Sequence, residues 1–521
     1  MSRSFDTVLI ANRGEIAVRI ARTLRERGLT SVAVFHPVDR ESLHVLAADR
    51  AVELTADDPR AAYLGVEALI RAAKASGAGA IHPGYGFLSE QARFSRACEE
   101  AGVVFIGPRA DTLATVGDKT SARAAARAAG LTVAPGWEGV PLDAKGRPTD
   151  EAIAAARSLG YPLLLKAVSG GGGKGMRVVR AAEALADGLL ATAREAQASF
   201  GSAAVYLERQ LEPVRHIEVQ FVGDGAGNVA HLFERECSLQ RRHQKVIEEA
   251  PGARVTAGLR AKLVESTKAL ASAVRYRGAG TAEFLVDAEG GTHFLEINAR
   301  IQVEHPVTEL VTGVDIVGLQ LDVALGRGLP ADLERAAPNG HAIEARLYAE
   351  DAMHDFLPQS GTIEALRLPS GPGVRVDTGV REGDEIGMHF DPMIAKISVW
   401  GPDRAAAVRR LGAALAATDV AGVVTNLPFL RLLATHPDFA GGDLSTSRIE
   451  HSIAPSWRSE RKTRALPDAV LAAAAVAITE GARVRQGHGA GAESRDNQAV
   501  PPNPWDVLSG FRLGGNARGD S

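Results

Sequence analysis

Apolar residues come in short runs separated by amphipathic segments along the first part of the chain. The run Val8–Ala11 predicts a buried strand, and apolar residues at helical spacing between positions 16 and 24 predict a helix directly after it. A second strand is predicted over 31–36, which makes a βαβ unit and therefore a parallel sheet. Because the alternation continues, we predict one doubly wound α/β domain over residues 1–118.

The turn between the first strand and the first helix argues against dinucleotide binding. A dinucleotide fold places three glycines there, so that the pyrophosphate can approach the backbone at the helix N-terminus. This turn, Asn12–Gly14, contains one glycine. We therefore favour a scaffold domain whose loop ends present side chains over an NAD-binding domain.

The pattern changes after residue 118. Strands from separate stretches, among them the hairpin 281–298, predict an antiparallel α+β domain over 119–330, followed by a mixed α/β domain over 331–450. The whole chain is thus expected to be a multidomain α/β and α+β protein. Residues 451–521 include a stretch without apolar periodicity, which predicts a linker or tail.

Composition restricts the function classes. The 521 residues carry a net charge of -4, so there is no general basic field and no nucleic-acid partner is predicted. Two cysteines, Cys98 and Cys237, fit a reducing compartment. The longest strongly apolar stretch, Ala469–Ile478, is too short to span a membrane, and the N-terminus does not resemble a signal peptide. We predict a cytoplasmic protein without a membrane partner.

A run of four glycines is the strongest single motif. The segment Ser169–Val179 reads SGGGGKGMRVV and follows a predicted strand. Glycine backbone can wrap a polyphosphate, and Lys174 adds a positive charge. The segment is not a Walker A loop, because Lys174 is followed by glycine rather than serine or threonine. We predict a phosphate-binding lid, and a plain surface loop is the alternative.

The predicted hairpin brings acidic residues together. A four-residue loop, Ala288–Gly291, would place Glu283 opposite Glu296 on one face, with Asn298 on the same face. Two facing carboxylates repel each other unless a cation lies between them, and Mg²⁺ prefers oxygen ligands. The hairpin therefore predicts a metal site. The alternative is two solvated glutamates, and a loop of odd length would remove the argument.

Charged residues cluster on either side of this hairpin in the sequence. Arg300, Glu304 and His305 follow it and could stabilise an anion and move a proton. Four basic residues without interleaved aromatics favour a compact anion site over nucleic-acid binding, with an ordinary charged surface as the alternative. These four are Arg241, Arg242, His243 and Lys245.

Eight sequence blocks between residues 8 and 397 resemble, in order, the signature blocks of biotin carboxylase, the ATP-grasp component of biotin-dependent carboxylases. The blocks are ANRGEIAVRI, HPGYGFLSE, GDK, SGGGGKGMR, ERECSLQRRHQKVIEEAP, LEINARIQVEHPVTE, IEARLYAED and FDPMIAKI. The resemblance implies an N-terminal domain over 1–118, an ATP-grasp domain over 119–330 with a lid at about 136–205, and a C-terminal domain over 331–450.

The resemblance also implies a reaction and roles for matching residues. ATP and bicarbonate would give carboxyphosphate, whose CO₂ is trapped by biotin on a carrier. The implied ATP-binding residues are Lys119, Lys166, Gly171, Gly172, Gly173, Lys174, Glu208, His216, Gln240 and His243. The implied ligands of Mg²⁺ or Mn²⁺ are Glu283, Glu296 and Asn298. The implied bicarbonate pocket consists of Lys245, Arg300, Gln302 and the backbone of Val303. Glu304 matches the base, and Arg346 matches the cation that stabilises the biotin enolate.

The sequence lacks its own biotin acceptor, because none of the five methionines precedes a lysine. The segment 503–515 nevertheless resembles a connector in the α-subunits of acyl-CoA carboxylases such as methylcrotonoyl-CoA carboxylase. We therefore expect a biotin carrier on a partner or on a continuation of the chain, a carboxyltransferase partner, and a homodimer as in stand-alone relatives. The alternatives are another ATP-grasp ligase and a catalytically silent nucleotide-binding subunit.

Overall fold

In the computed structural model of the protein, the described residues are 4–137, 140–143, 147–168, 176–333, 337–463 and Val476. The chain forms two compact units, Met1–Ala454 and Pro455–Ser521. The predicted glycine-rich lid loop, with Gly171, Gly172, Gly173 and Lys174, lies outside the described residues. Within the described part of the chain, no helix is long and apolar enough to cross a membrane.

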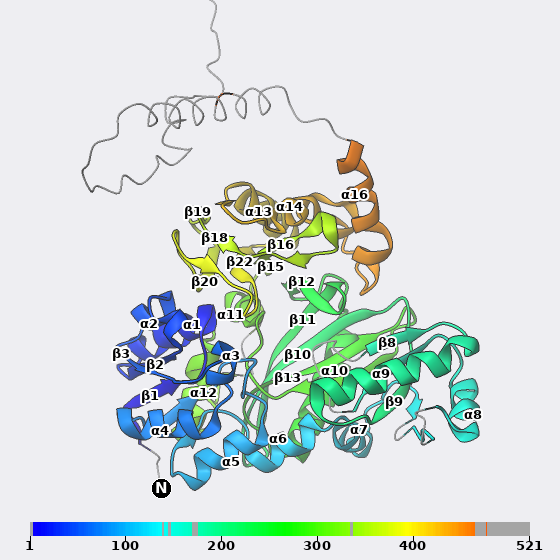
Figure 1. Ribbon diagram of the computed structural model, residues 1–521, viewed down its shortest axis with the longest axis horizontal. Helices are drawn as coiled ribbons and strands as arrows, with labels where there is room; N and C mark the ends of the chain where they lie inside the picture. The colour runs from blue at the N-terminus through cyan, green and yellow to red at the C-terminus, as the bar shows by residue number, and fades with distance from the viewer. Residues whose placement is uncertain are drawn as a thin grey trace, which may run out of the picture. The chain divides into compact units, whose positions relative to one another are not determined.

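The N-terminal region is built on a parallel sheet in the order β3-β2-β1-β4-β5, which confirms the predicted doubly wound α/β fold (Figure 1). Its strands are β1 (Thr7–Ile10), β2 (Thr30–Phe35), β3 (Arg50–Glu53), β4 (Ala80–His82) and β5 (Val104–Phe105). Its helices are α1 (Gly14–Glu26), α2 (Leu43–Ala47), α3 (Pro59–Ala62), α4 (Val66–Ser76), α5 (Ala92–Glu100) and α6 (Ala110–Gly117).

Both faces of this sheet are covered. Leu9 of β1 packs in one core with residues of α4 and α5. Its neighbours Val8 and Ile10 pack in another core with α1 and α12 (Ile316–Ala324). Successive side chains of a strand point to opposite faces, so the apolar run of β1 reflects burial on both sides.

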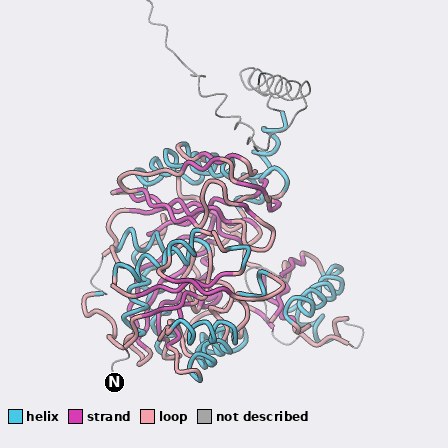
Figure 2. The backbone as a smooth tube through the Cα atoms, turned by 60° about the vertical axis from the view of Figure 1, so that its left-hand side comes forward, coloured by secondary structure: helices cyan, strands magenta, loops and turns pink. Residues whose placement is uncertain are grey.

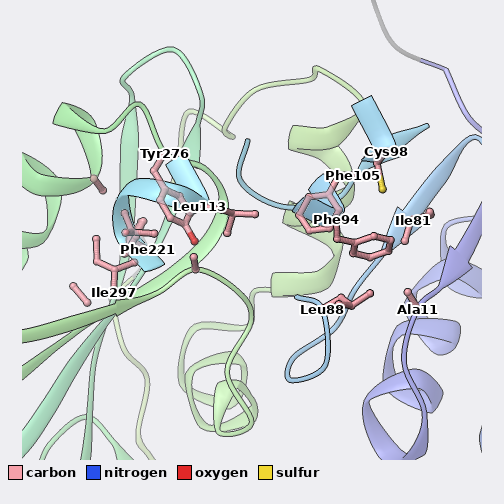
Figure 3. Close-up of a cluster of buried hydrophobic side chains, with 14 of the residues drawn as sticks. Ala11, Ile81, Leu88, Phe94, Cys98, Phe105, Leu113, Phe221, Tyr276 and Ile297 are labelled. Atoms are coloured by element: carbon pink, nitrogen blue, oxygen red, sulfur yellow. The ribbon is translucent and has the colours of Figure 1, made fainter. Parts of the chain in front are cut away.

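One hydrophobic cluster continues from this sheet into the central region. It contains Phe94 and Phe105 on one side and Phe221 and Tyr276 on the other (Figure 3). The rings meet edge to face, with centroids 5.7 Å apart in the first pair and 4.8 Å apart in the second. The two regions therefore share a core within the first compact unit.

The central sheet has eight strands in the order β14-β13-β10-β11-β12-β15-β22-β20, and every neighbouring pair is antiparallel. Its strands are β10 (Arg215–Asp224), β11 (Val229–Arg241), β12 (Gln244–Ala250), β13 (Arg277–Val286), β14 (Thr292–Asn298), β15 (His341–Tyr348), β20 (Val374–Thr378) and β22 (Met393–Gly401). The predicted domain boundary near residue 330 falls between β14 and β15, so strands from both sides of it belong to one hydrogen-bonded sheet.

The first unit also contains further helices and three short strand pairs. The helices are α7 (Lys119–Ala128), α10 (Ala257–Ala273), α11 (His305–Thr312), α13 (Arg404–Ala416), α14 (Leu427–Thr435) and α15 (Pro437–Ala440). Short antiparallel pairs join β16 (Glu350–Asp351) to β17 (Leu357–Pro358), β18 (Gly361–Thr362) to β21 (Glu385–Ile386), and β19 (Ala365–Arg367) to β23 (Asp419–Ala421).

A separate antiparallel sheet has the strand order β6-β9-β7-β8. Its elements are β6 (Gly136–Trp137), α8 (Asp150–Leu159), β7 (Leu163–Ala167), β8 (Met176–Val179), α9 (Leu185–Phe200) and β9 (Val205–Arg209). These elements share a hydrophobic core of their own and form a distinct group in Figure 2. The predicted lid region, about 136–205, coincides with this group apart from the end of β9, and its motion stays a prediction.

The hairpin of β13 and β14 differs from its prediction at the turn. Val286 pairs with Thr292, so the loop has five residues rather than the four predicted. A β-bulge with Leu295 as the extra residue then shifts the register by one. Glu283 therefore does lie opposite Glu296. The predicted pairing is confirmed, but the predicted turn length was wrong, and the bulge compensates for the odd-length loop.

Candidate active site

A row of charged residues crosses four neighbouring strands of the central sheet. Arg235 on β11 lies opposite Glu218 on β10, which lies opposite Glu283 on β13. Glu283 in turn lies opposite Glu296 on β14. Residues directly opposite each other share a face, so three carboxylates follow one another on the same side of the sheet. Arg235, Glu218 and Glu283 are all buried, and such a row requires cations.

Lys245 of β12 supplies one of those cations. Its Nζ donates to Glu218 Oε2 at 2.6 Å, to Glu283 Oε1 at 2.8 Å and to Glu304 Oε1 at 2.6 Å. Burial lowers the pKa of Lys245, but the three carboxylates outweigh it and raise that pKa well above its ordinary value. Arg235 supplies a second cation, because its Nε donates to Glu218 Oε1 at 2.5 Å.

The two ends of the predicted metal site differ electrostatically. Burial raises the pKa of Glu283, but Lys245 and His216 outweigh it and hold that pKa well below its ordinary value. Burial also raises the pKa of Glu296, and the facing Glu283 carboxylate raises it further. Among the described residues, Glu296 makes no hydrogen bond or close ion pair. A divalent cation at this end would remove the repulsion, so the donor set fits one.

His216, Glu218 and Glu283 also offer ligand atoms that lie within 4.8 Å of one another. The Nε2 atom of His216 is 3.0 Å from Glu283 Oε2, and its Nδ1 is 2.6 Å from Gln240 Nε2. His216 thus connects the predicted nucleotide residues with the predicted metal residues.

Glu304 lies between two cations at the start of α11. Besides Lys245, it contacts Arg346 of β15, whose Nη2 donates to Glu304 Oε2 at 3.1 Å. Burial raises the pKa of Glu304, but Lys245 and Arg346 outweigh it and lower that pKa below its ordinary value. Glu304 is fully buried, and its two cation partners favour the carboxylate form, which is the form a base requires. The Nε of Arg346 also donates to Glu248 Oε1 at 2.5 Å.

The predicted bicarbonate residues surround Glu283 and Glu304. Gln302 Nε2 donates to Glu283 Oε1 at 2.9 Å, and Asn298 Nδ2 donates to the same oxygen at 2.8 Å. Arg300 donates to Asn298 Oδ1 through Nη2 at 3.0 Å and to Gln302 Oε1 through Nη1 at 3.0 Å. Its Nε donates to Glu90 Oε2 at 3.1 Å. The carbonyl oxygen of Val303 accepts from Lys396 Nζ at 2.9 Å.

The other predicted nucleotide residues lie partly in the small sheet. Lys166 of β7 donates to Glu208 of β9 at 2.6 Å, and Arg123 donates to the other Glu208 oxygen at 2.9 Å. Burial lowers the pKa of Lys166, but Glu208 outweighs it and raises that pKa. Lys119 begins α7, and burial lowers its pKa although Glu296 acts in the opposite direction.

The four basic residues near position 243 do not gather into one anion site, so that interpretation was wrong. Arg241 pairs with Glu350, and Lys245 is held among the carboxylates. Arg242 and His243 form the exposed tight turn between β11 and β12, both with positive φ. Strand alternation and the turn separate the four side chains.

Sequence reasoning missed several charged residues that shape the site. They are Glu90, Arg123, Glu218, Arg235 and Glu248. Glu218 alternates with apolar residues along β10, a pattern equally typical of a solvated strand face. The signal that distinguishes the two is the neighbouring strand, which places Glu283 directly opposite.

An antiparallel sheet with a row of acidic residues, next to a small sheet that carries paired lysine and glutamate side chains, defines an ATP-grasp enzyme. Three family profiles match the chain in order. They are the biotin carboxylase N-terminal domain over residues 4–113, the carbamoyl-phosphate synthase L chain ATP-binding domain over 118–332 and the biotin carboxylase C-terminal domain over 344–451.

The chain is also similar in sequence to known proteins of this kind. The chain is 44% identical over 446 residues to biotin carboxylase of Nostoc sp., which covers 86% of this chain and 99% of that protein. It is 47% identical over 447 residues to the mitochondrial methylcrotonoyl-CoA carboxylase subunit alpha of Glycine max, covering 86% of this chain and 60% of that subunit. The chain therefore spans about three fifths of the length of such α-subunits.

A solved structure agrees as well. The biotin carboxylase domain dimer of Hydrogenobacter thermophilus 2-oxoglutarate carboxylase, in complex with MgADP, ADP and bicarbonate, is 41% identical with a TM-score of 0.83. The similarity covers 86% of this chain and 98% of that chain. The chain belongs to the biotin carboxylase family.

Proposed function

We propose that this chain carries out the ATP- and bicarbonate-dependent carboxylation of biotin on a carrier, as the first half-reaction of an acyl-CoA carboxylase. The observation that carries the proposal is the state of Glu304. It is fully buried, and it lies between Lys245 and Arg346, which hold its pKa below the ordinary value. Bicarbonate is a poor nucleophile until its remaining proton is removed, so a buried carboxylate base meets the main chemical need of the reaction.

The nucleotide is proposed to lie between the small sheet and the charged row. Lys166 and Lys119 would bind its phosphates, and Glu208, His216, Gln240 and His243 would surround its adenine and ribose. Lys166 is fixed by Glu208, with Nζ 2.6 Å from Oε1, so its ammonium group is preorganised for an anion. The glycine-rich segment is proposed to close over the phosphates and exclude water, which would otherwise hydrolyse carboxyphosphate.

A divalent cation, Mg²⁺ or Mn²⁺, is proposed to bind Glu283 and Glu296 with Asn298 nearby. The fit rests on Glu296, because burial and the facing Glu283 carboxylate raise its pKa. When bound, such an ion would reduce the repulsion between the two carboxylates and the terminal phosphates of ATP.

Bicarbonate is proposed to bind beside Glu304. Arg300, Gln302 and the Val303 backbone would hold its oxygens, and Lys245 would balance its charge. Glu304 takes the proton as the bicarbonate oxygen attacks the γ-phosphorus of ATP, the bond from that phosphorus to ADP breaks, and carboxyphosphate and ADP are formed. Carboxyphosphate then breaks down to CO₂ and phosphate, the released phosphate takes the proton of biotin N1, and N1 bonds to the carbon of CO₂. Arg346 is proposed to stabilise the negative charge on the biotin ureido oxygen.

The proposed partners follow from the relatives. The acceptor is biotin on a carrier domain or protein, and a carboxyltransferase subunit completes the cycle. A homodimer is proposed because a solved relative is a dimer. A cytoplasmic location is proposed because both cysteines are buried and unpaired; several α-subunit relatives are mitochondrial. We propose neither a nucleic-acid nor a membrane partner.

The test is ATP cleavage by the purified chain with and without bicarbonate and free biotin. We expect cleavage to require bicarbonate and to rise when biotin is added. Cleavage that is indifferent to biotin would favour another ATP-grasp ligase. Binding of a fluorescent ATP analogue without any turnover would favour a silent nucleotide-binding subunit.

A further inference from the structure

Lys396 of β22 is fully buried, and sequence analysis gave it no role. Its side chain is 0% exposed. Its Nζ donates to the carbonyl oxygen of Val303 at 2.9 Å and lies 3.2 Å from Glu15 Oε2. Val303 directly precedes Glu304, so this ammonium group contacts the backbone of the segment that carries the proposed base.

The sheet register places Lys396 beside Arg346. The two residues lie directly opposite each other on β22 and β15, and so they share a face. Arg346 contacts the Glu304 carboxylate, whereas Lys396 contacts the carbonyl one residue earlier. Two adjacent strands thus contact consecutive residues of the connection between β14 and α11.

The other partner of Lys396 comes from the N-terminal region. Glu15 lies in the first turn of α1 and also accepts a hydrogen bond from the Tyr85 hydroxyl. The backbone at this point is tightly packed, because a Cβ on Gly379 would lie 2.5 Å from the Glu15 nitrogen. The position of Glu15 relative to β20 and β22 is therefore fixed by packing as well as by charge.

We propose that Lys396 is a positioning residue for the base Glu304, and that Glu15 anchors Lys396 from the N-terminal region. The proposal rests on the function proposed above. The carbonyl of Val303 and the amide of Glu304 belong to one planar peptide group. The hydrogen bond from Lys396 to that carbonyl fixes the backbone at Glu304. The Glu304 carboxylate therefore keeps a constant orientation toward bicarbonate.

Loss of the contact is expected to act on turnover rather than on nucleotide binding. Among the residues that the structure describes, Lys396 makes no hydrogen bond or ion pair with those proposed for ATP. A displacement of about 1 Å at a reacting group can reduce the rate by on the order of 10²-fold. We therefore expect a lower kcat for bicarbonate-dependent ATP cleavage with a nearly unchanged KM for ATP.

The main test variant is the double substitution Glu15→Gln with Lys396→Met, which removes both charges of this pair together. Asp377, which lies opposite Lys396 on β20, keeps Arg375 as its partner. The matched control is Ser398→Ala, on the same strand and face. Ser398 donates to Glu344 at 2.6 Å and makes no side-chain hydrogen bond with residues 302–304. Lys396→Arg keeps the positive charge beside Glu15 and should give a kcat between those of the wild type and the double variant.

We expect the double variant to melt near the wild-type temperature, to lose about ten- to 100-fold in kcat, and to keep its KM for ATP within about twofold. A folded double variant with wild-type kcat would overturn the proposal, and so would an equal loss of kcat in Ser398→Ala. If the double variant does not fold, wild-type kcat in Lys396→Arg overturns it. Failure of the proposed function would show differently, as wild-type protein without bicarbonate-dependent cleavage.

Discussion

Two lysines of the central sheet differ in burial and in their partners: the Lys245 side chain is 11% exposed and that of Lys396 is 0% exposed. Lys245 donates to three carboxylates, those of Glu218, Glu283 and Glu304. Lys396 has one carboxylate, Glu15, and one peptide carbonyl. Arg235 and Arg346 also contact carboxylates around Lys245, and Asp377 lies opposite Lys396 on β20. The two clusters therefore differ in how many carboxylates share one ammonium group. We infer that the Lys245 cluster is organised for incoming cations and substrate, and that the Lys396 pair serves to hold elements together.

The largest expected effect is the loss of Lys245. Lys245→Met leaves three buried carboxylates without their shared cation, so we expect the free energy of unfolding to fall by about 3–5 kcal/mol. Lys396→Met should cost less, about 1–3 kcal/mol, because Glu15 can take up a proton once its partner is gone. Denaturant unfolding measures both, with the exposed Lys262→Met as the control. Equal losses for the two lysines would contradict the comparison.

The next effect concerns the pH dependence of stability. Burial raises the pKa of Glu15 from 4.5 to about 7; Lys396 opposes this rise, and Asp377 adds to it. Because the folded pKa is raised, the stability associated with protonated Glu15 is complete below about pH 4.5 and is lost as the pH rises through 7. Through this group, the unfolding free energy of the wild type should fall by on the order of 3 kcal/mol between pH 5 and pH 8. Glu15→Gln should not show that part of the decrease.

Unfolding free energies of the wild type and Glu15→Gln, measured at intervals across that range, test this point. Tyr85 and Arg375 also face Glu15 and should be left unchanged. Parallel pH profiles for the two proteins would show that Glu15 is not the titrating group.

A smaller effect is expected at the other end of the acidic row. Glu296→Gln removes the repulsion with Glu283, so we expect the metal-free variant to be at least as stable as the wild type at neutral pH. In the presence of ADP, addition of Mg²⁺ should stabilise the wild type by about 2–3 kcal/mol at roughly 100 times its Kd. The variant should lose most of that gain. Glu289→Gln, an exposed glutamate in the same hairpin, is the control, and an undiminished Mg²⁺ effect in Glu296→Gln would exclude Glu296 as a ligand.

These comparisons show where sequence patterns suffice and where they do not. The parallel N-terminal sheet was predictable because β1 is an apolar run buried on both faces. The predicted pairing of Glu283 with Glu296 is correct, but the predicted turn is one residue too short. The sequence could not show this, because the bulge at Leu295 leaves no mark in the hydrophobic pattern.

The contacts of the buried cations were less predictable. Arg241 and Lys245 are close in sequence, but their side chains reach different partners. The partners of Lys396 lie on segments far away in the sequence, at Glu15 and Val303. Such contacts depend on strand order across the sheet, which a single sequence does not reveal.

The smallest effect is expected at Glu90, which contacts Arg300 from the N-terminal region with Oε2 3.1 Å from Nε. The Glu90 side chain is 36% exposed, and pairs of this kind contribute about 0–1 kcal/mol. Glu90→Gln should therefore raise the KM for bicarbonate by no more than about fivefold and leave kcat nearly constant. Steady-state kinetics with Glu99→Gln as the exposed control measures this change, and a large loss of kcat would give Glu90 a greater role than its contact indicates.

The most direct test of the account is bicarbonate-dependent ATP cleavage by Glu304→Gln. The substitution preserves the size of the side chain and removes its capacity to accept a proton as a base. We predict a loss of about 10²- to 10⁴-fold in biotin-stimulated turnover, with ATP binding retained. Turnover close to that of the wild type, in a variant that folds and binds ATP, would show that the buried carboxylate between Lys245 and Arg346 is not the base.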